Sequence, residues 1–383
     1  MRVDLPQPSP DELAHSERLA ALIRAEIQAA DGALDFARYM ELALYAPGLG
    51  YYSAGAAKFG AAGDFVTAPE LGFVFARCLA RAIAPTLRET RGDILELGPG
   101  SGALAAELLA ELERLNALPA RYFLLERGAD LRERQRERIL RQCPHLHERC
   151  IWLDAPPTKP WHGALIANEV VDALPVRTFA LRDEGLFARA VGVDGDGRFV
   201  WREIPADATL RADIARVVAD ASTLPRPFVS EFCPMLAPWF AEVVRNLESG
   251  AAWFIDYGYA REDYYSAHRG SGTLRCHWRH RAHDDPLILP GLQDITAHVD
   301  FDALIEAGIR AGFKAFASQP QAQFLIRNGL EEVFADAYAN TADETVRYAL
   351  AQQVKRLTLP GQMGEAFGVV CFDTKTHAAG LPT

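Results

Sequence analysis

Residues 93–102 read Asp-Ile-Leu-Glu-Leu-Gly-Pro-Gly-Ser-Gly, and most of the interpretation of the chain depends on them. A short apolar run enters a cluster of three glycines, and leucines at helical spacing follow from Leu104 to Leu115. This pattern is typical of a strand, a tight turn and a helix. Glycine permits unusual backbone angles and lets a ligand approach the main chain. The helix that follows presents unpaired N–H groups to such a ligand.

Two classes of cofactor are bound by turns of this kind. The dinucleotide pattern Gly-x-Gly-x-x-Gly/Ala is met by Gly98, Gly100 and Ala103. The pattern acid-x-Gly-x-Gly-x-Gly, used for S-adenosyl-L-methionine, is met by Glu96 and the three glycines that end at Gly102. A carboxylate just before the first glycine repels a pyrophosphate but suits the cationic S-adenosyl-L-methionine. We therefore favour this cofactor over NAD, and over a glycine-rich turn that binds no ligand.

Strands and helices alternate after the turn, and acids follow the next two strands. The second strand, 121–126, ends in Glu126. An acid about 20 residues beyond the glycines holds the ribose hydroxyls in such folds, so we expect that role for Glu126. The third strand, 150–153, is followed by Asp154, at the strand end that commonly meets the adenine ring. The alternative for Glu126 is a helix cap or a surface charge, and the alternative for Asp154 is an ordinary surface charge.

The fourth strand, 163–167, runs into the segment Asn168-Glu169-Val-Val-Asp172. In an open doubly wound sheet, ligands bind beyond the carboxyl ends of the strands, where the strand order reverses. We place that reversal between the first and fourth strands. The loop after the fourth strand then faces the cofactor, and its two acids and one amide are well placed for chemistry.

Composition narrows the class of protein. Lys and Arg total 40 against 51 for Asp and Glu, a formal net charge of −11, which argues against a nucleic-acid partner because such partners need a basic face. The six cysteines are scattered without a Cys-x-x-Cys pair, so we expect reduced thiols and a cytoplasmic location. The N-terminus lacks the apolar block of a secretory signal, and we predict no membrane span.

A polar segment, 270–286, contains three histidines spaced three residues apart: His277, His280 and His283. This spacing raises the question of a zinc site. Zinc takes His and thiolate ligands in tetrahedral geometry, whereas arginines are interleaved with these histidines and raise the local positive potential. We therefore predict no metal and interpret the segment as a mobile loop that faces the substrate.

Seven motifs resemble, in order, those of the MidA-like family of S-adenosyl-L-methionine-dependent methyltransferases, whose mitochondrial members are arginine methyltransferases of complex I assembly. They span most of residues 36–325. The motifs are Gly50-Tyr-Tyr52, Gly63-Asp-Phe-Val-Thr-Ala-Pro-Glu70, Glu96-Leu-Gly-Pro-Gly-Ser-Gly102, Asn168-Glu-Val-Val-Asp-Ala-Leu-Pro175, Phe254-Ile-Asp-Tyr-Gly258, Gly272-Thr-Leu-Arg-Cys276 and Asp294-Ile-Thr-Ala-His-Val-Asp300.

The resemblance implies an α/β fold with a class I methyltransferase (Rossmann-like) doubly wound sheet. We expect a helical N-terminal and lid region over 1–90, a cofactor-binding core over 91–260 and a substrate-facing region that completes the sheet over 261–383. A β arm is expected to be inserted at 178–225, where strand-like runs are separated by Asp-Gly turns. The resemblance also implies methyl transfer to a protein arginine, on a partner such as a respiratory-complex subunit.

The chemistry of an arginine acceptor defines the expected catalytic residues. A guanidinium is a cation of very high pKa, and carboxylates can localise its charge through forked hydrogen bonds so that one nitrogen attacks the methyl group. The candidates are Glu169, Asp172 and Glu70, although an acid at a helix start also has a purely structural explanation. A small-molecule methyltransferase and a cofactor-binding assembly factor with little turnover are the alternatives. The expected cofactor-binding residues are Asp64 and Thr67, which form a lid, with Glu96, Gly98, Gly100, Ser101, Gly102, Glu126, Asp154 and Asn168.

Overall fold

A computed structural model of the protein describes residues 5–54, 68–218 and 220–375. Its largest sheet has eight strands: seven lie in the order β15-β16-β10-β5-β2-β3-β4, and the short β14 pairs with β10. The strands are β2 (Asp93–Leu97), β3 (Tyr122–Leu125), β4 (Cys150–Leu153), β5 (Trp161–Asn168), β10 (Leu247–Tyr259), β14 (Val299–Asp300), β15 (Ala315–Pro320) and β16 (Phe367–Asp373).

The strand order reverses between β2 and β5, as predicted. β2 pairs in parallel with both β3 and β5, and β5 pairs in parallel with β10. The last strand, β16, lies antiparallel between β10 and β15. This doubly wound α/β sheet confirms the expected fold class, and it places the turn after β2 beside the loop after β5.

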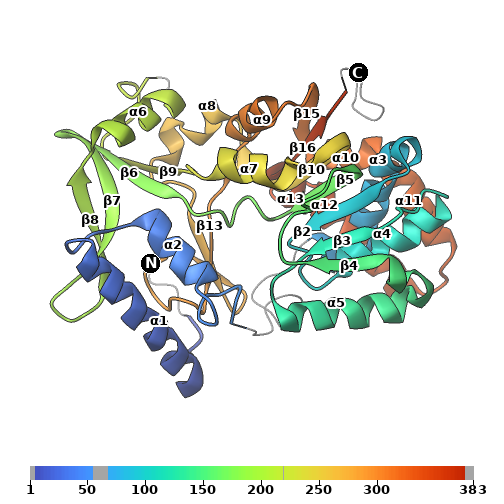
Figure 1. Ribbon diagram of the computed structural model, residues 1–383, viewed down its shortest axis with the longest axis horizontal. Helices are drawn as coiled ribbons and strands as arrows, with labels where there is room; N and C mark the ends of the chain where they lie inside the picture. The colour runs from blue at the N-terminus through green and yellow to red at the C-terminus, as the bar shows by residue number, and fades with distance from the viewer. Residues whose placement is uncertain (1–4, 55–67, 219, 376–383) are drawn as a thin grey trace.

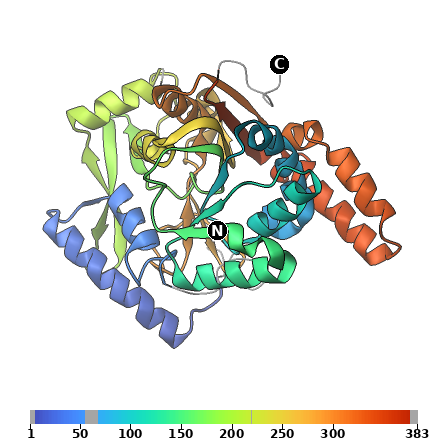
Figure 2. The same cartoon turned by 45° about the vertical axis from the view of Figure 1, so that its right-hand side comes forward.

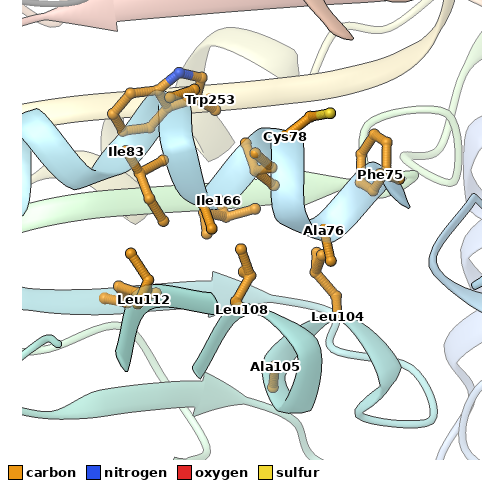
Figure 3. Packing of buried hydrophobic residues seen from close by; sticks show 14 of the residues in the cluster. Phe75, Ala76, Cys78, Ile83, Leu104, Ala105, Leu108, Leu112, Ile166 and Trp253 are labelled. Atoms are coloured by element: carbon orange, nitrogen blue, oxygen red, sulfur yellow. The ribbon is translucent and has the colours of Figure 1, made fainter. Parts of the chain in front are cut away.

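Helices cover both faces of the sheet because its central strands are apolar on both sides. All five residues of β2 are buried. One face packs against α3 (Phe73–Thr90), α4 (Ala103–Arg114) and α5 (Ala129–Gln142), and the opposite face packs against α7 (Leu236–Val244) and α9 (Phe301–Arg310). Figure 3 shows Leu104 and Leu108 of α4 facing α3, with Ile166 of β5 in the same cluster. This packing fixes the start of α4, and with it the glycine turn.

The predicted β arm is a five-stranded antiparallel sheet that also includes a strand from the N-terminal region. Its order is β1-β7-β6-β9, and β8 pairs with β7. Figure 1 shows this sheet and the first two helices on the side of the molecule away from α4 and α5. The elements are β1 (Leu34–Asp35), β6 (Arg177–Arg182), β7 (Gly185–Val193), β8 (Phe199–Pro205) and β9 (Phe228–Phe232), with α1 (Pro10–Ala29), α2 (Phe36–Tyr45) and α6 (Ala208–Val217).

The segment 270–286, predicted to be a mobile loop, instead forms an ordered hairpin within a three-stranded sheet. The order is β12-β11-β13, and the strands are β11 (Arg275–Trp278), β12 (Arg281–His283) and β13 (Asp294–Thr296). Cys276 and Ile295 are fully buried, and Arg279 at the hairpin turn pairs with Glu12 of α1 at 2.8 Å. Pairing of β11 with β12 and β13 and the burial of Cys276 order the segment, and its polar composition alone does not reveal them.

The remaining elements are short or lie near the C-terminus. They are the 3-10 helices η1 (Ala68–Leu71), η2 (Pro144–Arg149) and η3 (Ala267–Arg269), and the helices α8 (Arg261–Tyr264), α10 (Gln321–Arg327), α11 (Leu330–Ala339), α12 (Glu344–Thr358) and α13 (Met363–Ala366). In Figure 2 the orange-red helices of this C-terminal part project to the right of the central sheet. Within the described ranges, no helix has both the length and the apolar composition that a membrane span requires.

Candidate functional site

The turn after β2 has the geometry that its glycines predict. Gly98, Gly100 and Gly102 all have positive φ, at 58°, 52° and 80°. A Cβ on Gly98 would lie 3.1 Å from Cγ2 of Val170, so the main chain of the turn directly contacts the loop after β5. Gly102 forms the N-cap of α4 and has no side chain to satisfy the first N–H groups of that helix. The turn therefore offers open main chain and helix N–H groups at the carboxyl edge of the sheet.

Glu96 lies one residue before the end of β2 and is 2% exposed. Its Oε2 accepts a hydrogen bond from the Tyr122 hydroxyl at 2.8 Å, and the described residues contain no ion pair with it. Burial raises the pKa of Glu96 to about 7, and the Tyr122 hydrogen bond opposes that shift. A buried carboxyl without a cation is costly to ionise, and the ammonium of S-adenosyl-L-methionine is a group that would stabilise it.

Glu126 follows β3 and is brought next to the glycine turn. Its Oε1 accepts from the Gly128 amide at 2.7 Å, and its Oε2 is 3.5 Å from Nε2 of Gln135, which also donates to the Gly100 carbonyl at 2.8 Å. Burial raises the pKa of Glu126, and these two donors oppose the rise. The carboxyl keeps part of its surface open, as a group that accepts ribose hydroxyls requires.

Asp154 does not lie beside the glycine turn with Glu96 and Glu126. Its side chain is 82% exposed and pairs with Arg132 at 2.5 Å. Arg132 also donates to the Glu126 carbonyl at 2.6 Å, and Arg127 donates to the Asp154 carbonyl at 3.1 Å, so two arginines link Asp154 to the region of Glu126. The strand-end position of Asp154 is as predicted, but its role toward a cofactor remains a prediction.

Asn168, at the end of β5, has a buried polar atom that is available to a ligand. Its Nδ2 donates to Glu169 Oε1 at 3.1 Å, whereas its buried Oδ1 has no hydrogen-bond partner among the described residues. Buried polar atoms are nearly always paired in native proteins. An unpaired amide oxygen, an uncompensated Glu96 carboxyl and open glycine main chain together fit a cofactor with an ammonium and hydroxyl donors.

Glu169 and Asp172 lie in a group of carboxyls at the ends of β5 and β10. Glu169 adopts φ of 53°, and its oxygens accept from the Ala68 amide at 3.4 Å and the Tyr257 hydroxyl at 3.3 Å. Burial, followed by the charge of Asp256, raises the pKa of Glu169 to about 8. Burial and the charges of Asp256, Asp294 and Glu169 likewise hold the pKa of Asp172 well above its usual range.

Asp256 was not singled out from the sequence, although it belongs to a conspicuous strand-end motif. One of its oxygens accepts the amides of Val170, Val171 and Asp172 at 3.3, 2.9 and 3.2 Å. Burial raises the pKa of Asp256 to about 7, and these three amides oppose the rise. Asp256 therefore shapes the loop that carries Glu169 and Asp172.

Two tyrosines from the N-terminal region complete this group, and the sequence interpretation missed both. The rings of Tyr45 and Tyr52 stack with centroids 5.5 Å apart. Tyr45 donates to the Ala173 carbonyl at 2.9 Å, and Tyr52 donates to Asp294 Oδ1 at 2.9 Å. The motif that contains Tyr52 was the available signal, but nothing local indicated that it meets Asp294. Aromatic faces beside carboxyls suit a cation.

Glu70, predicted as a third catalytic acid, is engaged elsewhere. It pairs with Arg138 of α5 at 2.9 Å and accepts a hydrogen bond from the Ser101 hydroxyl, which also contacts Arg138. Glu70 therefore fastens η1 to the glycine turn. Arg138 lies on the highly charged helix α5, and the burial of the neighbouring Ile139 shows that part of this helix faces inward.

Two further expectations, the lid and the absence of a metal, and one cavity concern the surroundings of the site. Asp64 and Thr67 lie outside the described residues. Among those residues, no group of three or more His, Cys, Asp or Glu side chains is arranged to hold a metal ion. A cavity of about 280 Å³ lies between the β arm and α7 and α9, and its lining includes Val171 and His298 but none of the predicted site residues.

Comparison with known proteins agrees with this geometry. Residues 78–319 match the model of a family described as "Putative S-adenosyl-L-methionine-dependent methyltransferase". A crystal structure of a candidate methyl transferase from Burkholderia thailandensis, bound to S-adenosyl-homocysteine, is 43% identical and superposes with a TM-score of 0.91, covering 97% of this chain and 95% of that one. The expectation of S-adenosyl-L-methionine as cofactor is confirmed, and NAD is set aside.

More distant relatives carry a more specific name. The Drosophila melanogaster protein arginine methyltransferase NDUFAF7 homolog, mitochondrial, is 27% identical over 414 residues, which cover 96% of this chain and 88% of the relative. The Danio rerio protein arginine methyltransferase NDUFAF7, mitochondrial, is 27% identical over 378 residues, which cover 88% and 83%. The resemblance noted from the seven motifs is therefore confirmed.

Proposed function

The chain belongs to this family of S-adenosyl-L-methionine-dependent methyltransferases, and from that premise we propose that it methylates an arginine side chain of a protein. The observation that carries the proposal is the cluster of buried carboxyls beside the cofactor turn. The described residues contain no ion pair with Glu169, Asp172 or Asp256, and the pKa of each is raised by burial. Such a group is stabilised by a cation. The names of the Drosophila and zebrafish relatives support arginine as that cation.

In this proposal some residues bind the cofactor and others bind the acceptor. The bound cofactor supplies an electrophilic methyl group on a sulfonium. Gly98, Gly100 and Glu126 would hold the cofactor, with Glu96 toward its ammonium. Glu169 and Asp172 would accept hydrogen bonds from the guanidinium and localise its charge away from the attacking nitrogen. The protein contributes mainly orientation and charge, since the leaving group is already good.

The hydrogen bonds of Glu169 prepare it for this role. The Tyr257 hydroxyl and the Ala68 amide both donate to the ionised form, which lowers a pKa that burial raises. An incoming guanidinium lowers the pKa further, so the acceptor itself favours the ionised carboxylate. Methylation of a guanidinium nitrogen requires the loss of one N–H proton if the product is to remain a monocation, and the Glu169 carboxylate can accept that proton.

The test is transfer of a labelled methyl group from S-adenosyl-L-methionine into proteins of a cell lysate, followed by hydrolysis and separation of methylated amino acids. We expect label in methylarginine, with at least tenfold less in Glu169→Gln and Asp172→Asn because each loses a charge-assisted bond. Glu137→Gln is the matched control, since Glu137 is exposed on α5 and the expected yield is unchanged.

Each outcome bears on the proposal. Label in methylarginine that depends on Glu169 supports it. Label that accumulates in a small-molecule fraction, or in another amino acid, overturns the arginine assignment and favours another acceptor. Binding of S-adenosyl-homocysteine without any transfer favours an assembly factor with little turnover.

The division of the chain and its location are part of the proposal. The core over 91–260 binds the cofactor, while 1–90 and 261–383 supply the acceptor side. Tyr45 and Tyr52 from the first flank and Asp294 from the second, next to Asp172, support this division. We propose a cytoplasmic location on the basis of six unpaired cysteines, and fractionation is its test, since the relatives are named as mitochondrial. The partner is an arginine-bearing protein, such as a respiratory-complex subunit.

A further inference from the structure

Gln135 is a fully buried polar residue in the middle of the otherwise highly charged helix α5. It lies four residues before the buried Ile139, so both side chains face inward. The packing against the cofactor turn is close, because a Cβ added to Gly102 would lie 3.0 Å from Cα of Gln135. A polar side chain at such a position costs free energy unless its hydrogen bonds are satisfied.

The amide of Gln135 joins three strands at their carboxyl ends. Its Nε2 donates to the Gly100 carbonyl after β2 at 2.8 Å and lies 3.5 Å from Glu126 Oε2 after β3. Its Oε1 accepts from the indole Nε1 of Trp152 in β4 at 2.7 Å. One side chain therefore touches the glycine turn, the acid expected to bind the ribose, and the neighbouring strand.

The direction of the amide follows from chemistry. An indole N–H can only donate, so the oxygen of Gln135 must face Trp152. The amide nitrogen must then face Gly100 and Glu126, which are both acceptors. The position of Trp152 is itself held, because the Arg136 guanidinium lies 4.7 Å from the centre of its ring. Trp152 thus selects the amide orientation that gives the cofactor site a donor.

We propose that Gln135 is a positioning residue of the cofactor site: its amide, oriented by Trp152, fixes the glycine turn and the Glu126 carboxylate relative to each other. The Glu126 carboxylate then meets the ribose of the cofactor and the glycine turn meets its amino-acid tail. The distance between the turn and the carboxylate is set before the cofactor binds. The donor also stabilises the ionised form of Glu126, the form that accepts two ribose hydroxyls. This assignment rests on the cofactor and is independent of the acceptor.

The test is isothermal titration with S-adenosyl-homocysteine at pH 8.5 and pH 5.5, which requires no acceptor. We expect Gln135→Met to bind about tenfold more weakly at both pH values, since it loses a hydrogen bond that also supports a charged group. Gln135→Glu is the sharper variant. When ionised it repels Glu126 and the Gly100 carbonyl, and when protonated it can donate again, so its deficit relative to the wild type should shrink as the pH falls.

The chain offers a matched control on the same helix. Gln142 is exposed, and its Nε2 donates to Glu107 at 2.9 Å, so Gln142→Glu also places a new acid beside an existing one. Its affinity for S-adenosyl-homocysteine should stay within twofold of the wild type at both pH values. An equal deficit for the two Gln→Glu variants, a pH-independent deficit for Gln135→Glu, or a Gln135→Met affinity within twofold of the wild type would each overturn the assignment.

A spectroscopic readout separates positioning from a general loss of fold. With tryptophan labelled by nitrogen-15, the indole signal of Trp152 can be assigned through Trp152→Phe. We expect S-adenosyl-homocysteine to shift this signal in the wild type and not in Gln135→Met. A shift that persists without the Gln135 amide would contradict the proposal. If Gln135→Met does not fold, Trp152→Phe serves alone, with an expected loss of about threefold in affinity because the amide is no longer oriented.

Discussion

Glu96 is 2% exposed in the middle of the sheet, and burial raises its pKa to about 7 from an ordinary value of 4.5. Between these two values the native state holds a proton that the unfolded chain releases. The free energy of unfolding therefore falls as the pH rises through this window. Below about pH 4.5 Glu96 is protonated in both the native and the unfolded state, so the free-energy cost of ionising a buried carboxyl is absent. We call this cost the penalty. Above about pH 7 the penalty is complete.

The substitution Glu96→Gln should remove this penalty. The amide oxygen can still accept the Tyr122 hydroxyl, which is 2.8 Å from Oε2, but the side chain no longer ionises. The difference between the two pKa values corresponds to about 3 kcal/mol, as an upper bound, at about 1.4 kcal/mol for each pH unit. The variant should therefore gain up to about 3 kcal/mol on the wild type between pH 4.5 and pH 8.

The assay is urea denaturation of the protein without cofactor at both pH values. The relevant quantity is how the difference in unfolding free energy between Glu96→Gln and the wild type changes with pH. Any stability lost because the new amide N–H is unpaired is the same at both pH values and does not affect this change. Glu148→Gln, on an exposed acid, should show no such change. A difference between Glu96→Gln and wild type that stays constant with pH would refute the argument. The same variant should bind S-adenosyl-homocysteine about tenfold more weakly, since the ammonium loses its counter-ion.

Three other predictions concern the turn, the core and the acceptor site. Gly98→Ala should lose about 1–2 kcal/mol of stability and most of its cofactor affinity in melting and titration experiments, because φ is 58° and the new methyl group meets Val170. Leu108→Ala should lose about 2–5 kcal/mol in urea denaturation, since the side chain is fully buried between α4 and α3. The value of kcat/KM for the arginine acceptor should rise with pH and level off above about 8, where Glu169 is ionised, and a flat pH profile would contradict this role.

The cofactor half of the site could be predicted because its signals are local. The glycine turn follows directly from Gly98 and Gly102, whose positive φ angles other residues rarely adopt. The strands that flank it are short apolar runs, and the parallel order then brings the ends of β2, β3 and β5 to one edge. Glu126 and Asn168 could be named from their strand-end positions alone, although their roles remain predictions.

Side-chain partnerships within that half could not be predicted. Gln135 and Arg138 belong to a helix whose charged composition indicates a solvated face, and the helical period alone does not say which side turns inward. Glu70 was expected to meet the acceptor, whereas its ion pair with Arg138 depends on how η1 packs on the turn. The hairpin over 275–283 likewise pairs with β13, and its turn meets Glu12, more than 260 residues away in the sequence.

The residues proposed to bind the acceptor come from separate parts of the chain, unlike the residues of the cofactor turn. Tyr52, Ala173 and Asp294 converge through hydrogen bonds made by Tyr45 and Tyr52, yet they come from three regions with no shared local pattern. The cofactor turn, by contrast, lies within one strand-turn-helix unit. Changes in the N-terminal region or in β13 can therefore alter the proposed acceptor site without disturbing the glycine turn. Cofactor chemistry can stay fixed in such an architecture while the methylated partner changes.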